Sequence, residues 1–101
     1  MALIRKRQPQ RRNIVGERVR EARQRFTPPL TQDQLSGKLA GKGVQLDRVA
    51  IAKVESGLRS VFDFEVRALA SVLRVDVRWL LGINTERLPQ GNKPPPGKAR
   101  T

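Results

Sequence analysis

The sequence predicts an all-α domain of five short helices, flanked by flexible basic tails. Between about residues 13 and 88, apolar residues recur every three or four positions, the pattern of helices that bury one face. Gly, Pro and N-cap residues divide this pattern into short segments. No alternating run bounded by hairpin signals competes with it, so no sheet is expected.

The first predicted helix extends from about Asn13, a suitable N-cap, to Phe26, and the prolines at 28–29 end it. The second begins at Thr31, because Thr31 and Gln34 match a capping box in which each side chain bonds to the other residue's backbone N–H. The inward residues are Val15, Val19, Ala22 and Phe26 in the first helix, and Leu35 and Leu39 in the second.

Gly41 and Gly43 end the second helix, and the third begins after the N-cap Asp47 and closes at Ser56 and Gly57. Its apolar anchors are Val44, Leu46, Ile51 and Val54. The fourth and fifth helices are expected over roughly 63–74 and 76–82, the fifth with Asp76 as its cap. Their inward residues are Phe64, Val66, Leu69, Ala70 and Leu73, then Trp79, Leu80 and Leu81.

Charge points to a polyanionic partner, nucleic acid ahead of anionic membrane. The chain has 21 Lys and Arg against 9 Asp and Glu, a formal net charge of +12. The helical domain, 13–88, holds all the acidic residues and is only mildly basic, whereas the charged residues of both flanks are all basic. We therefore expect a flexible basic arm at 1–12 and a disordered Pro-rich tail at 89–101.

The absence of Cys and His removes the usual ligands of structural zinc and the commonest general base. No nucleophile paired with a base is evident either. We therefore expect no enzyme, no metal and no cofactor. No apolar run has the length of a signal peptide or a membrane span, so a soluble cytosolic protein is expected.

The stretch from Thr31 to Gly57 has the requirements of a helix-turn-helix. Ser36 is small where two helices would cross, the turn contains glycines, and Ile51 and Val54 anchor the inner face. The residues on the opposite face of the third helix are candidates to read bases in the major groove. They are Arg48, Val49, Ala52 and Lys53. Arginine and lysine donate to guanine O6 and N7, while valine and alanine contact thymine methyl groups.

Leu39 and three longer segments carry a family pattern: Leu-Thr-Gln-Asp-Gln-Leu-Ser at 30–36, Val-Ala-Ile-Ala-Lys-Val-Glu-Ser-Gly at 49–57 and Leu-Ala-Ser-Val-Leu-Arg-Val-Asp-Val-Arg-Trp-Leu-Leu-Gly at 69–82. Together they resemble the Xre family, the phage-repressor-like helix-turn-helix regulators of the lambda repressor and Cro type. The resemblance covers about residues 13–83.

The resemblance implies a lambda-repressor-like fold and a sequence-specific transcriptional regulator, here a repressor that occupies its operator. It also implies a cytoplasmic protein of bacterial or phage origin that binds double-stranded DNA as a homodimer on two-fold sites. Phosphate contacts are implied for Thr31, Gln32, Arg59 and Ser60, and a structural ion pair for Arg23 and Glu55. The chain departs from the family in a longer turn between Leu39 and Asp47, and in Arg74 where a glycine cap is usual.

Three alternatives stay open. The basic residues of the arm either solubilise the chain or lie along phosphates or in the minor groove. These residues are Arg5, Lys6, Arg7, Arg11 and Arg12. The protein could instead be an antitoxin-type autoregulator with a protein partner, or a protein-interaction module with the same fold. Salt dependence separates the last from DNA binding, because only phosphate contacts release condensed counterions.

Overall fold

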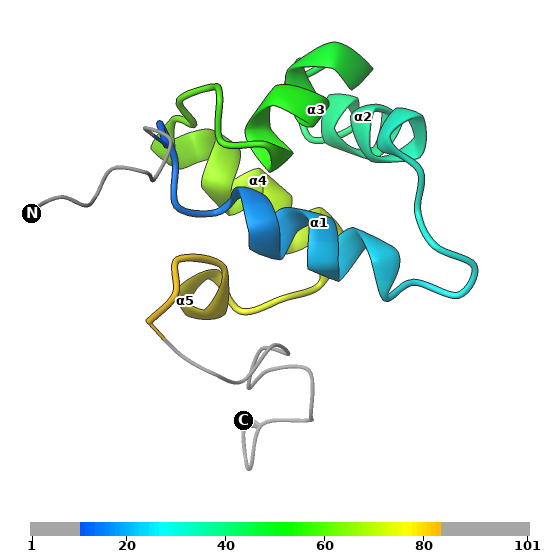
Figure 1. The fold of residues 1–101 in the computed structure, drawn as a ribbon. Helices are drawn as coiled ribbons and strands as arrows, with labels where there is room; N and C mark the ends of the chain where they lie inside the picture. Colours follow the sequence, from blue (N-terminus) through cyan, green and yellow to red (C-terminus); the bar gives the residue numbers. More distant parts are fainter. Residues whose placement is uncertain (1–10, 84–101) are drawn as a thin grey trace, which may run out of the picture.

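A computed structural model describes residues 11–83 of the chain. It contains five helices and, within those residues, no strand, which confirms the predicted all-α class (Figure 1). The helices are α1 (Gly16–Gln24), α2 (Gln32–Ala40), α3 (Arg48–Glu55), α4 (Asp63–Leu73) and α5 (Val77–Leu80). The expected arm residues Arg5, Lys6 and Arg7 and the expected tail at 89–101 lie outside the described residues.

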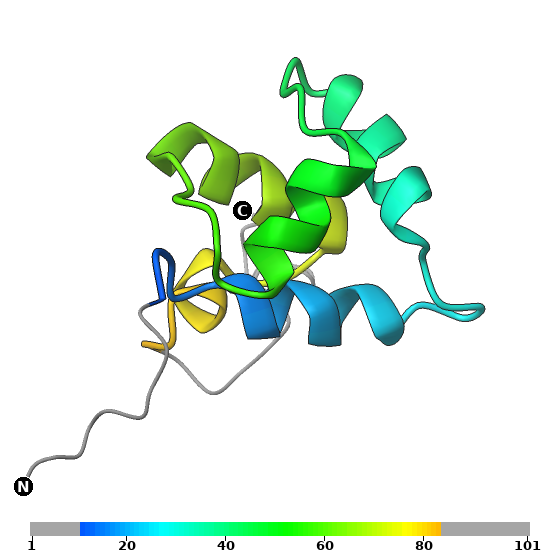
Figure 2. The ribbon, with the colours of Figure 1, turned by 45° about the horizontal axis from the view of Figure 1, so that its top comes forward.

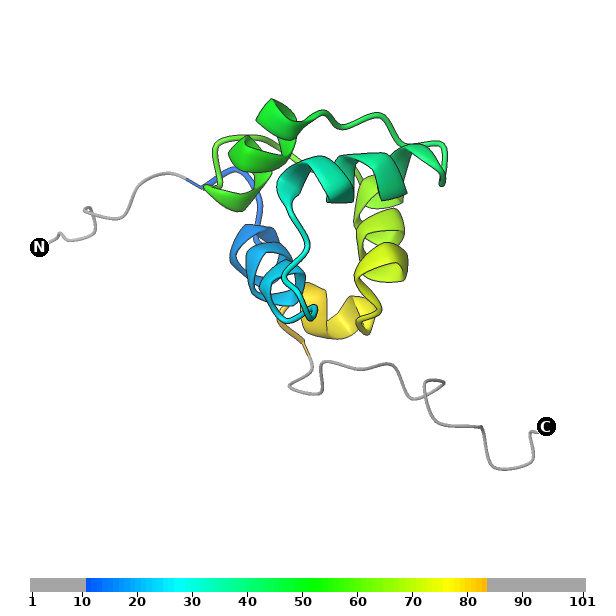
Figure 3. The same cartoon turned by 90° about the vertical axis from the view of Figure 1, so that its right-hand side faces the viewer.

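Helices α1 and α4 form two sides of the fold, with the α2–α3 pair at one end and α5 at the other (Figures 1 and 3). Helix α3 packs on α1 and α2, while α4 packs on α1, α2 and α5. The position of α3 is therefore determined by two neighbouring helices, and its remaining face is left to solvent.

One apolar core lies where the helices meet, and the core residues expected from helical periodicity are buried in it. These are Val19, Leu35, Leu39, Ile51, Leu69, Leu73 and Leu80. Trp79, also expected inside, is 4% exposed. Its ring centroid lies 4.8 Å from the Arg18 guanidinium carbon, a cation–π contact that ties α5 to α1.

The starts of α2 and α3 form as predicted. Thr31 Oγ1 accepts from the Gln34 N–H at 3.0 Å, and Gln34 Oε1 accepts from the Thr31 N–H at 2.8 Å, which completes the capping box. Asp47 Oδ1 caps α3 by accepting from the Ala50 N–H at 2.8 Å. These side chains satisfy backbone donors that the first helical turn leaves without partners.

Helix α1 is shorter than predicted at both ends. The Asn13 side-chain oxygen accepts from the N–H groups of Val15 and Gly16 as a cap does, but the α-helix begins only at Gly16. At the other end, Arg25 and Phe26 donate to carbonyls three residues back, so the last turn is of the tighter 3₁₀ type and the α-helix ends at Gln24.

The expected inward position of Phe64 is wrong, and α5 is shorter than predicted. The inner face of α4 runs through Glu65, Leu69 and Leu73, which are all buried, so Phe64 is 53% exposed and its ring stacks on Phe62. Helix α5 ends at Leu80 rather than Gly82. Arg74 ends α4 in the left-handed region, with φ of 60°, the conformation that a glycine cap usually provides.

Candidate nucleic-acid interface

Helix α3 presents a continuous exposed face. Ile51, Val54 and Glu55 are buried, and the helical turn therefore directs the four candidate base-reading residues away from the core. Arg48, Val49 and Lys53 are exposed and Ala52 is half-buried. Val49 is 55% exposed, which leaves its methyl groups available to an apolar contact.

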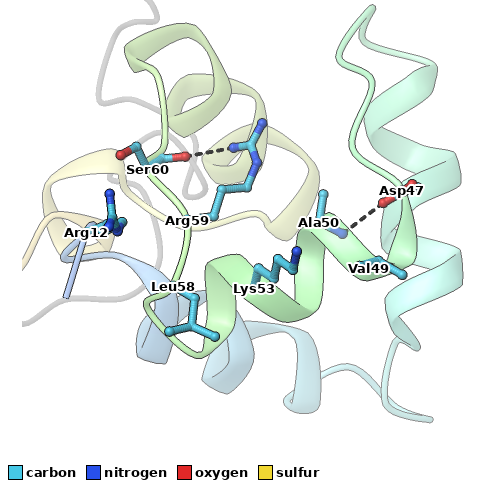
Figure 4. A pocket seen from close by; sticks show the side chains of 8 residues that line it. All are labelled: Arg12, Asp47, Val49, Ala50, Lys53, Leu58, Arg59 and Ser60. Atoms are coloured by element: carbon cyan, nitrogen blue, oxygen red, sulfur yellow. Dashed lines mark hydrogen bonds between the residues drawn. The ribbon is translucent and has the colours of Figure 1, made fainter. Parts of the chain in front are cut away.

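A hollow of about 580 Å³ lies beside this face. It is lined by Arg12, Asp47, Val49, Ala50, Lys53, Leu58, Arg59 and Ser60. Lys53 projects from α3 between Val49 on one side of the hollow and Arg12 on the other (Figure 4). The hollow thus joins α3, the loop after it, and the segment that precedes α1.

The cations at this surface differ in how far they are neutralised. Among residues 11–83, neither Arg12 nor Lys53 is in an ion pair, and Arg48 meets only the exposed Asp33 carboxylate, at 3.8 Å. Asp47 adds a negative charge at one end of the hollow, but its carboxylate caps α3. Three largely uncompensated cations therefore face solvent together, a charge distribution that attracts anions.

The four expected phosphate contacts fall into two groups. Thr31 and Ser60 are exposed. The Gln32 amide instead donates to Glu55 Oε1 at 3.1 Å, and the Arg59 guanidinium bonds to both carboxylate oxygens of Glu65 and to the Ser60 carbonyl. Gln32 and Arg59 thus contribute to holding the fold.

Arg23 and Glu55, the pair implied by the family resemblance, are in contact. Their side chains are 12% and 5% exposed, and the closest pair of atoms is 2.7 Å apart. Arg23 also donates to the Leu30 carbonyl at 2.9 Å. With Gln32 on the same carboxylate, this network joins α1, the α1–α2 loop and α2 to the end of α3.

The segment before α1 is joined to the end of α3, which sequence reasoning did not anticipate. The Arg12 N–H donates to the Gly57 carbonyl at 2.8 Å, and residues 11–15 run beside the loop after α3 (Figure 2). The Asn13 amide donates to the carbonyls of Val54 and Arg59. An asparagine before a helix indicates a cap, and nothing in the sequence indicates a partner more than forty residues away.

Comparisons with protein-family models, curated proteins and solved structures give no match to this chain. Within residues 11–83, no group of three or more His, Cys, Asp or Glu is arranged to hold a metal ion. None of the five described helices is long and apolar enough to cross a membrane. Function is therefore inferred from the residues and their geometry.

Proposed function

We propose that the protein is a sequence-specific DNA-binding transcriptional regulator of the Xre type, a repressor that occupies its operator. In this proposal α2 and α3 are the helix-turn-helix, and α3 enters the major groove. The observation that carries it is the exposed face of α3, where two cations and two small apolar side chains lie side by side.

This face has the chemistry needed to read base edges. Arg48 and Lys53 supply hydrogen-bond donors for guanine O6 and N7, and Val49 and Ala52 supply contacts for thymine methyl groups. The buried side of α3 is held by the apolar core and by Glu55, so the reading side chains stand on a rigid element.

The proposed phosphate contacts come from the start of α2 and the loop after α3. Thr31 and Ser60 are exposed and available there. Because the Gln32 amide is directed to Glu55, Gln32 contributes through its backbone N–H at the positive end of α2. Arg59 keeps Nε–H and one Nη2–H uncommitted among the described residues, which is enough for one phosphate oxygen.

We include homodimerisation on DNA in the proposal. A hollow of about 750 Å³ between α4 and α5 is lined mainly by apolar side chains, among them Val66, Ala70 and Leu81. Asp63 and Arg67 also line it. In an isologous contact across this hollow, Asp63 of one copy could face Arg67 of the other, and the pair would then occur twice.

Selection of bound duplexes from a random DNA pool tests the proposal. The expected result is an enriched two-fold site, which the variant Arg48→Ala/Lys53→Ala fails to enrich. The matched control Arg20→Ala/Lys38→Ala removes two exposed cations from α1 and α2 and should enrich the wild-type site. Tight binding at low salt without enrichment of any site would contradict sequence-specific recognition.

Salt titration separates this function from the protein-interaction alternative. With about six phosphate contacts, affinity for duplex DNA should fall ~10³-fold between about 50 and 200 mM salt. A protein-interaction module with solvated cations would show no such dependence in binding its partner.

A further inference from the structure

We propose that Arg12 is a fixed contact to a DNA backbone phosphate, and that Asn13 is the residue that positions it. The inference rests on the proposed DNA binding and adds a residue outside the two helices that would form the helix-turn-helix. It also assigns Arg12 to the folded domain, whereas the sequence predicted this residue to lie in a flexible arm.

Asn13 anchors the segment. It is 9% exposed, its amide donates to the Val54 carbonyl at 3.0 Å and to the Arg59 carbonyl at 2.8 Å, and its oxygen accepts from the N–H groups of Val15 and Gly16. Two donors and two accepted bonds use the full capacity of an asparagine side chain. The chain next to Arg12 is therefore held to the last turn of α3 and to the middle of the α3–α4 connection.

The contact between α1 and the end of α3 leaves little room for movement. A methyl group on Gly16 would overlap the Val54 carbonyl oxygen, so the first turn of α1 lies directly against the backbone of α3. The Arg12 N–H bond to Gly57 adds a third link on the same side. Because these links are backbone or buried, the Arg12 Cα keeps its place relative to α3.

Arg12 and its neighbour Arg11 differ in charge environment. Arg11 is paired with Glu17 at 3.1 Å and lies over Gly57. Arg12 is exposed, lines the hollow together with Lys53 and Ser60, and among residues 11–83 is in no ion pair. An unpaired guanidinium has the planar fork that matches a phosphate, and because the Arg12 backbone is already fixed, binding would order only the side chain.

The position of Arg12 favours the DNA backbone over a base edge. Arg12 lies across the hollow from Val49, with Lys53 between them, so it flanks the proposed reading face (Figure 4). When a helix lies in the major groove, the sugar-phosphate strands run along its flanks. Arg12 should therefore strengthen binding to every sequence equally.

The test compares Arg12→Gln with Arg11→Gln in the full chain, on the selected site and on random duplex, from about 50 to 200 mM salt. Arg12→Gln should weaken binding to both DNAs and lower the salt slope by about one, so that its deficit relative to wild type shrinks about 3.5-fold across this range. Arg11→Gln, whose charge is already paired, should keep the wild-type slope. Both variants should unfold at the wild-type urea midpoint.

Asn13 is tested as a positioning residue by a double-mutant cycle. Asn13→Ala should lower the salt slope in the wild-type background and leave it unchanged in the Arg12→Gln background. If Asn13→Ala does not fold, the salt slope of Arg12→Gln still tests the phosphate contact, because Arg12 is exposed and its substitution leaves the core intact. If Arg12→Gln keeps the wild-type salt slope, or loses affinity only at one base pair of the site, the inference about Arg12 is wrong and the proposed DNA binding still stands. A wild-type protein that binds no duplex DNA overturns the proposed function and this inference together.

Discussion

The guanidinium of Arg23 holds the carboxylate of Glu55 through two hydrogen bonds, Nε to Oε2 at 2.7 Å and Nη2 to Oε1 at 2.9 Å. A bidentate arginine–carboxylate pair of this kind has two charge-assisted hydrogen bonds, which are stronger than neutral ones. Both groups are almost excluded from water, and Gln32 adds a further donor to Glu55. The end of α3 is thereby tied to α1 and to the start of α2.

Glu55→Gln should destabilise the fold by about 3 kcal/mol, because it leaves a buried arginine facing a neutral amide of the same volume. Urea unfolding followed by circular dichroism measures the change. Glu17→Gln removes a carboxylate from the exposed Arg11 pair and should cost less than about 1 kcal/mol. Equal costs for the two variants would contradict a structural role for the buried pair.

Gly16→Ala and Gly37→Ala should change stability in opposite directions. A methyl group at residue 16 meets the Val54 carbonyl oxygen, so the α1–α3 contact must open at a cost of about 1–3 kcal/mol. Gly37 lies inside α2 with no atom within 4 Å of an added methyl group, and alanine there should stabilise by about 0.5–1 kcal/mol. Thermal unfolding of both variants shows whether each substitution raises or lowers the stability. If Gly16→Ala is more stable than wild type, α1 and α3 are not in close contact at residue 16.

Local rules predicted much of this fold but not the face that α4 buries. The caps at Thr31 and Asp47 involve neighbours in sequence, so pattern alone located them. The failure at Phe64 has another cause: Glu65 turns inward to accept from the Phe62 N–H and from Arg59. These partners are three and six residues away along the chain, so the error came from expecting the apolar Phe64, rather than the charged Glu65, to face the core.

The same limit applies to the candidate site. Helical period placed Arg48, Val49 and Lys53 on the exposed face of α3. Asn13 bonds to the carbonyl of Val54, 41 residues away, and no local motif encodes that tertiary contact. Arg59 pairs with Glu65 only six residues along the chain, but helical period did not predict that Glu65 faces inward. Sequence could therefore locate the surface but not the residues that support it.

Arg74→Gly should stabilise the protein by about 0.5–1 kcal/mol. Arg74 has φ of 60°, a conformation that costs side-chain-bearing residues about 1 kcal/mol and that glycine adopts freely, with part of the gain offset by the greater freedom of glycine in the unfolded chain. Arg74→Ala removes the same charge but keeps a Cβ, so it should show no gain. If both variants are equally stabilised, charge rather than backbone conformation is responsible.

Asp76 should make the protein less stable in acid. Hydrogen bonds from the Arg78 side chain, and then from its backbone N–H, hold the pKa of the Asp76 carboxyl below its ordinary value. A carboxyl with a lowered folded pKa contributes stability above its unfolded pKa, and that contribution is lost as pH falls through the folded value.

Asp76→Asn keeps an oxygen that can cap α5 but removes this titration. Between about pH 5 and pH 2.5, the melting temperature of wild type should therefore fall further than that of the variant, and the two curves should converge. Parallel curves over that interval would show that the charge of Asp76 contributes nothing to the acid sensitivity of the fold.

Lys53→Ala should relax the preference at one base pair of the selected site, at a cost of about 1–3 kcal/mol there and little elsewhere. Competition binding, with DNA sites that each carry one base-pair substitution, measures this preference.

Ser60→Ala is the contrasting variant, because loss of a phosphate contact weakens binding to all sequences alike. Arg59→Ala is a poorer comparison, since it strands the buried carboxylate of Glu65 and so affects folding as well. If Lys53→Ala weakens every site equally, Lys53 belongs with the phosphate contacts, and base reading rests on Arg48, Val49 and Ala52.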